Sequence, residues 1–103
     1  MKTLEVDEDF YEATNLYRHK YATTIDDTKG RIYFKERIIE YNPIYNDEGA
    51  TMAHEVFHHL YKEEDLPESE IEERSQEYYK THKKSIDRLV RELLKKDKDA
   101  ITE

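Results

Sequence analysis

The spacing of hydrophobic and polar residues changes several times along the chain, and each pattern predicts a different element. From Asp7 to Tyr21, apolar residues recur at steps of three and four behind an acidic start, which predicts an amphipathic helix. From Thr24 to Tyr41, a turn-forming segment at residues 26–30 precedes a stretch rich in β-branched and aromatic residues. We therefore expect an N-terminal helix followed by a small antiparallel sheet of three strands.

The segment after these strands predicts the central helix of the fold. Asn42 and Pro43 close the sheet region, because proline cannot donate a ladder hydrogen bond and the residue before it disfavours helix. Asn46 or Asp47 can then cap a helix that continues to about Tyr61 and carries apolar residues along its inner face.

A helical pattern continues over most of the remaining chain. Pro67 in a first helical turn, followed by three glutamates, favours a helix start, and apolar residues keep helical spacing to Lys96, with or without a break near Thr81. Residues 85–103 carry an apolar stripe that must be buried somewhere. This stripe could cover a cleft and keep the protein latent, could join two copies as a homodimer, or could belong to an ordinary core helix.

Together these elements predict one α+β domain over residues 1–103, with no internal repeat and no interdomain linker. The expected order is an N-terminal helix, a small three-stranded antiparallel sheet, the central helix, a glutamate-bearing helix and a C-terminal helical segment. A chain of this length buries only about 60–65% of its unfolded surface, so large side chains or a bound ligand should add stability.

Composition narrows the classes of function. Lys+Arg number 17 and Asp+Glu 25, which gives a net charge of −8, and the acidic residues are spread without a basic block. Nucleic acid and anionic membrane surfaces are therefore not expected partners. No apolar stretch approaches the roughly 20 residues of a membrane span, and the N-terminus lacks a signal-peptide core, so we expect a soluble cytoplasmic protein. Many charges and few amides resemble the composition of thermophile proteins.

The strongest chemical signal is the motif HExxH, from His54 to His58 in the predicted central helix. Its two histidines lie one helical turn apart and can direct two imidazoles at one metal ion. Glu55 is turned so that its carboxylate can reach a metal-activated water molecule and act as general base. The chain's own composition yields about 0.04 chance matches to this motif, so accident is a poor explanation.

A catalytic zinc site has three protein ligands and one open position, so a third donor is needed. The chain has no cysteine, which leaves carboxylates of the following helix as candidates. Glu72 shares a helical stripe with Ser75, whose small side chain would let two helices approach closely, whereas Glu73 falls among polar residues. We expect Glu72 rather than Glu73 to be the third ligand. Zinc is the preferred ion for such histidine and carboxylate ligands.

The HExxH motif followed by ExxSQ at residues 72–76 resembles the gluzincin pattern of zinc peptidases. Over about residues 24–80 the chain most resembles the minigluzincins, which are small soluble proteins similar to the catalytic cores of CAAX-protease and HtpX membrane peptidases. It is also similar to ImmA/IrrE-like proteins. The resemblance implies that the two motif histidines and Glu72 bind zinc and that Glu55 is the general base. Gln76 stands where many relatives have aspartate, at a position expected to orient a ligand histidine.

Other histidines and tyrosines are weaker candidates. Tyr78, Tyr79 and His82 could stabilise an oxyanion, a role that needs a donor near the metal. At helical spacing, however, aromatic residues usually build the core. His59 points about 100° away from His58 and is expected at the surface or beside the site.

Zinc-dependent hydrolysis of a peptide or protein substrate is therefore the expected function, with the strand at residues 38–41 as the expected edge for an extended substrate. The protein is expected to be latent through its C-terminal segment. Two alternatives remain open at this stage. One is a regulatory peptidase, similar to the ImmA/IrrE group, that cuts one specific partner. The other is a non-catalytic metal-binding helical module.

Overall fold

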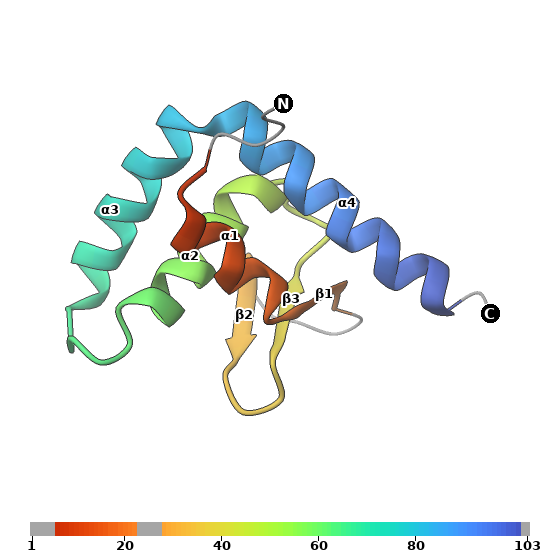
Figure 1. The fold of residues 1–103 in the computed structure, drawn as a ribbon, viewed down its shortest axis with the longest axis horizontal. Coiled ribbons are helices and arrows are strands. Elements are labelled where there is room, and N and C mark those ends of the chain that lie inside the picture. The colour runs from red at the N-terminus through yellow and green to blue at the C-terminus, as the bar shows by residue number, and fades with distance from the viewer. Residues whose placement is uncertain (1–5, 23–27, 102–103) are drawn as a thin grey trace.

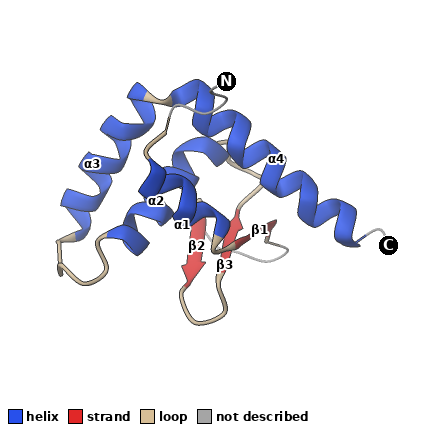
Figure 2. Cartoon of the chain, viewed as in Figure 1, coloured by secondary structure: helices blue, strands red, loops and turns tan. Residues whose placement is uncertain are grey.

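The computed structural model describes residues 6–22 and 28–101 and has an α+β fold (Figure 1; Figure 2). Side chains are described as far as Lys96. The elements follow one another in this order: α1 (Glu8–Asn15), β1 (Arg18–Tyr21), β2 (Gly30–Tyr33), β3 (Ile38–Tyr41), α2 (Glu48–Leu60), α3 (Glu68–Thr81) and α4 (Lys83–Ile101). Within the described ranges, no helix combines the length and apolar character needed to cross a membrane.

Helix α2 lies at the centre of the fold, as its apolar face predicted. It contacts α1, α3, α4 and two strands of the sheet. In Figure 1, α3 and α4 diverge from a shared corner, and α2 lies between them with α1 across it. The pattern left open whether one long helix or two would follow Pro67. The structure has two, α3 and α4, which meet at His82.

The first predicted helix is shorter than expected. Helix α1 ends at Asn15, where the backbone N–H of Leu16 bonds to the carbonyl of Ala13 in a tight turn. Residues Arg18–Tyr21 form strand β1 instead. The prediction of helix as far as Tyr21 is therefore wrong at its end. Charged residues alternate here with ring-bearing ones, a period of two that is compatible with a strand, and pairing with β3 favours the strand over the helix.

Within the residues that the structure describes, the sheet has three strands in the order β1-β3-β2, so β3 is paired on both sides. Strand β2 runs antiparallel to β3, with Ile32 opposite Ile39, whereas β1 runs parallel to β3, with His19 opposite Ile39. The predicted antiparallel sheet is thus only partly right. A parallel pair forms because the chain leaves β1, builds β2 and then returns between the two strands.

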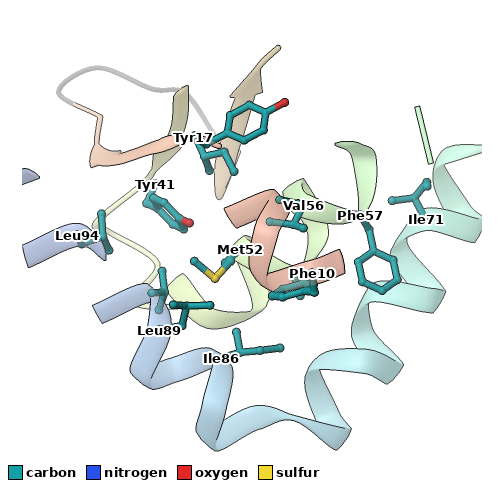
Figure 3. Packing of buried hydrophobic residues seen from close by; sticks show 14 residues of the cluster. Phe10, Tyr17, Tyr41, Met52, Val56, Phe57, Ile71, Ile86, Leu89 and Leu94 are labelled. Carbon is teal, nitrogen blue, oxygen red and sulfur yellow. The ribbon is translucent and has the colours of Figure 1, made fainter. Parts of the chain in front are cut away.

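The core lies around the inner face of α2, where Met52 and Val56 are almost fully buried (Figure 3). Phe10 of α1 and Ile39 of β3 pack against this face. Helix α4 adds its apolar stripe to the same cluster: Ile86, Leu89, Val90 and Leu94. Within the described side chains, the stripe therefore belongs to an ordinary core helix.

A buried histidine ties α1 to the sheet. His19 is 2% exposed; its Nε2 lies 2.8 Å from the carbonyl oxygen of Thr14 and its Nδ1 lies 2.7 Å from the Tyr41 hydroxyl. Because a carbonyl can only accept, Nε2–H donates to Thr14 and Nδ1 accepts from Tyr41. The neutral ring satisfies both bonds, and burial lowers the pKa of His19 below its usual 6.5.

This burial predicts that the fold loses stability in weak acid. Below about pH 6.5, His19 is protonated in the unfolded chain but stays neutral in the folded chain, because its pKa is lower there. The free energy of unfolding therefore decreases as the pH falls toward the pKa of the folded state. The slope from one such proton is at most about 1.4 kcal/mol per pH unit. The free energy of unfolding of the metal-free protein can be measured with urea at several pH values between 7.5 and 5. It should fall less steeply with decreasing pH for His19→Gln than for the wild type. Equal slopes in both chains would contradict this prediction.

Candidate metal centre

Helix α2 places the two histidines of the HExxH motif on the face that meets α3. Their Nε2 atoms lie 3.2 Å apart, and their ring centroids 4.9 Å. Both rings are partly buried: the side chains of His54 and His58 are 20% and 30% exposed. The pair was predicted from a spacing of four residues, and the helical geometry that this spacing requires is present.

A carboxylate from the first turn of α3 completes the cluster. One oxygen of Glu68 lies 2.9 Å from His54 Nε2, and its other oxygen lies 3.1 Å from His58 Nε2. These three side chains form a group that could hold a metal ion. Sequence reasoning missed Glu68, although it lies one helical turn before Glu72 on the same stripe of α3.

The donor atoms of this cluster fit a small divalent cation. Zinc bonds of about 2.0–2.1 Å in a tetrahedral arrangement place neighbouring donors about 3.3 Å apart. The Nε2 atoms of His54 and His58 are 3.2 Å apart, one oxygen of Glu68 lies 2.9 Å from the first and its other oxygen 3.1 Å from the second. One ligand atom from each of the three residues lies within 4.8 Å of the other two. Acceptor atoms this close together also need a proton or a cation between them, since their lone pairs otherwise repel one another. The set of two imidazoles and one carboxylate matches the ligands that zinc takes in hydrolases.

Glu72, the predicted third ligand, lies on the other side of the His54 ring. Its Oε1 atom is 2.8 Å from His54 Nδ1, whereas the donors that converge on a common point are the Nε2 atoms. Its role as a direct ligand stays a prediction. Gln76, predicted to orient a ligand histidine, donates its amide N–H to Glu72 Oε2 at 2.5 Å and so reaches His54 only through that carboxylate.

Glu55, the predicted general base, is 8% exposed and follows His54 on α2. Burial raises the pKa of its carboxyl to about 7; the charge of Glu68 adds to the rise and His54 opposes it. A carboxyl with this pKa can both accept and release a proton near neutral pH.

His58 is also suited to its predicted role. Burial lowers the pKa of its ring below the usual value, while the neighbouring Glu68 carboxylate works in the opposite direction. Lowering the pKa favours the neutral imidazole, which is the form that binds a metal ion.

The cluster lines a cavity of about 770 Å³ whose walls come from α2, α3, Lys83 at the start of α4 and residues 28–30, which lead into β2. Lys29 lies on this wall, and its Nζ atom is 2.9 Å from the carboxylate of Asp47. The strand approaches α2 closely because Gly30 has no side chain: a Cβ there would overlap Thr51. Asp47, one of the two predicted caps of α2, is the residue before the helix and uses its side chain for Lys29 instead of a cap bond.

Two of the three predicted oxyanion stabilisers lie elsewhere. Tyr78 packs against Phe10 and Phe57, and its hydroxyl accepts a hydrogen bond from the backbone N–H of Asp7. His82 stacks on Tyr78 at 4.2 Å between ring centroids and donates to the Tyr78 carbonyl. Neither residue lines the cavity. The core role that their helical spacing favoured explains both of them.

Tyr79, the third candidate, does line the cavity. Its hydroxyl donates to Asp87 Oδ1 at 2.8 Å, and Lys83 holds the other oxygen of that carboxylate at 3.1 Å. The hydroxyl proton is therefore already used. A Cβ at Gly49 would overlap Asp87 and Tyr79, so glycine lets this group pack against the start of α2.

His59 and the C-terminal segment do not contribute to the cavity. The Nδ1 atom of His59 lies 2.8 Å from the Tyr17 hydroxyl, on a different side of α2. No described side chain of residues 85–96 lines the cavity, so this part of α4 does not cover the cluster as the latency prediction required. The side chains of residues 97–103, including any acidic residue expected to approach the metal, lie outside the described part of the chain.

Comparison with known proteins adds no family to this picture. No protein family, curated protein or solved structure matches the chain.

Proposed function

We propose that the chain is a zinc-dependent metallopeptidase of the gluzincin type. One observation carries this proposal: two imidazoles of α2 and a carboxylate of α3 converge at distances suited to a metal ion, in a cavity that the buried Glu55 also lines. A histidine pair, an acidic side chain near it and a buried carboxyl are each common in proteins. Their combination around an HExxH helix that lines a cavity is typical of metal-assisted hydrolysis.

In this proposal, His54, His58 and a glutamate of α3 hold the ion, and zinc follows from the nitrogen and oxygen donors. When bound, zinc would lower the pKa of a water molecule and polarise the carbonyl group of a peptide. Glu55 takes the proton from the attacking water on one carboxylate oxygen. It then delivers that proton to the amine nitrogen as the peptide C–N bond breaks.

The strand at residues 38–41, which was expected from the sequence to pair with an extended substrate, is not available for that role. Strand β3, at residues 38–41, is paired on both sides and has no free ladder groups for a substrate. Strand β2 is at the edge of the described sheet, and residues 28–30 leading into it line the cavity. We therefore propose that an extended peptide pairs with β2, with main-chain hydrogen bonds giving affinity.

Metal analysis combined with a cleavage assay tests this function. The protein purified from zinc-containing medium should hold about one zinc ion per chain and should cleave an unfolded protein such as reduced, alkylated casein. A chelator should abolish cleavage and added zinc should restore it. His58→Ala should lose both properties, whereas His59→Ala, one position along the same helix, should keep its zinc.

Other outcomes would redirect the proposal. Stoichiometric zinc without cleavage of unfolded proteins would favour either a non-catalytic metal-binding module or a regulatory peptidase that accepts one partner only. Purified protein that neither contains nor takes up zinc would reject the metal centre altogether.

A further inference from the structure

We infer that Glu72 is a positioning residue of the metal centre: it acts through the His54 ring, while Glu68 supplies the carboxylate ligand. This inference rests on the proposed metal centre. The gluzincin resemblance implies Glu72 as the third ligand, whereas α3 places Glu68 at Nε2 of His54 and Glu72 at Nδ1.

The two glutamates approach opposite nitrogens of one ring. Glu68 lies 2.9 Å from His54 Nε2, on the side where His58 Nε2 is also found, and Glu72 lies 2.8 Å from His54 Nδ1. The ring nitrogens of an imidazole face in diverging directions. One ion therefore cannot take Nε2 of His54 together with the Glu72 oxygen that contacts Nδ1.

The two contacts of the His54 ring give its nitrogens different roles. Glu68 and His58 lie on the Nε2 side, where the ion would be held, so Nδ1 carries the proton of the neutral ring and donates it to the Glu72 carboxylate, which only accepts. The lone pair is then on Nε2 and points at the cluster. A carboxylate in this position also makes the ring a stronger ligand and fixes its orientation.

Glu72 is itself held in place. The Gln76 amide donates to its second carboxylate oxygen, one helical turn further along α3. Ser75, which is 2% exposed, brings α3 close to α2, as its small side chain predicted. Gln76, which stands where many gluzincin relatives have aspartate, thus has a structural role. Its neutral amide orients the Glu72 carboxylate without adding a second negative charge beside it.

Cobalt titration of the metal-free full-length chain tests the inference without relying on catalysis. Co²⁺ reports the number and type of its ligands through its visible absorption. We compare the wild type with Glu68→Gln and Glu72→Gln, and use Glu73→Gln, an exposed neighbour on α3, as the matched control. Circular dichroism and thermal melting establish that each variant is folded.

Glu72→Gln should bind Co²⁺ about 10- to 100-fold more weakly and should keep the wild-type absorption spectrum, because the ligand set is unchanged. Gln76→Leu should weaken binding in the same direction. Glu68→Gln should change the spectrum and bind weakest of all, because a ligand is lost. Glu73→Gln should match the wild type.

Two results would overturn the inference. If Glu72→Gln changes the spectrum while Glu68→Gln does not, Glu72 is the ligand. If Glu72→Gln binds as tightly as Glu73→Gln, the contact with His54 has no effect on the metal. A wild type that fails to bind Co²⁺ would reject the metal centre and the inference together. By contrast, expected spectra from a protein that cleaves no peptide would leave the inference standing and reject only the peptidase assignment.

Discussion

Replacing Glu55 with glutamine is expected to abolish peptide cleavage and to leave the bound zinc in place. The amide has nearly the same shape as the carboxyl but cannot accept a proton from water, and general-base catalysis contributes about 10²- to 10⁴-fold to the rate. Glu55 is not one of the three side chains that converge at the cluster, so metal content should not change. The measurement is kcat/KM on an unfolded protein substrate, together with zinc per chain.

Stability measurements separate this loss of activity from misfolding. Burial disfavours the charged form of Glu55 and raises its pKa from 4.5 to about 7, so the folded metal-free chain carries a cost that grows between these pH values and is fully present above about 7. An uncharged amide removes this cost. The melting temperature of metal-free Glu55→Gln at pH 8 should therefore equal or exceed that of the wild type. Cleavage within a few fold of the wild-type rate would reject the assigned role of Glu55.

The features that could be predicted from the sequence are the local ones. The central helix and the pairing of His54 with His58 depend on a spacing of four residues, which any regular helix turns into proximity. The burial of Ser75 and of the α4 stripe also follows from helical periodicity. In each case, neighbours along the chain determine the result.

The features that were missed depend on long-range placement. The sequence predicts helix over strand β1 because Tyr17 and Tyr21 satisfy a step of four, while the charged residues between them satisfy the alternation of a strand equally well. What favours the strand is its pairing with β3, about 20 residues later. No local pattern contains that partner.

Which glutamate, Glu68 or Glu72, lies at the Nε2 side of the histidine pair also depends on long-range placement. These residues share one stripe of α3, so periodicity alone cannot separate them. The segment between α2 and α3 sets how far α3 is displaced along α2, and it includes Asp65 with a left-handed backbone, φ 51°. A displacement of one helical turn exchanges one glutamate for the other, and a sequence pattern does not contain this displacement.

Removing the chain beyond Lys84 is expected to unfold the protein, because, counting only the described side chains, this deletion takes four buried residues of α4 out of the core. Each buried aliphatic side chain contributes about 1.5–3 kcal/mol, so the four together contribute about 6–12 kcal/mol. A small domain has only about 5–15 kcal/mol of stability in total. These residues are Ile86, Leu89, Val90 and Leu94. Circular dichroism of the shortened chain should show loss of the helical signal.

Point variants show whether the core role of α4 is its main one. Ile86→Ala leaves a cavity in the core and should cost about 2–5 kcal/mol in urea unfolding, whereas Glu92→Ala, on the exposed face of the same helix, should stay within about 0.5 kcal/mol of the wild type. Neither change should raise peptide cleavage, because no described side chain of residues 85–96 lines the cavity of the metal centre. A chain shortened after Lys84 that remains folded and cleaves faster than the wild type would contradict this account and would instead support an inhibitory C-terminal segment.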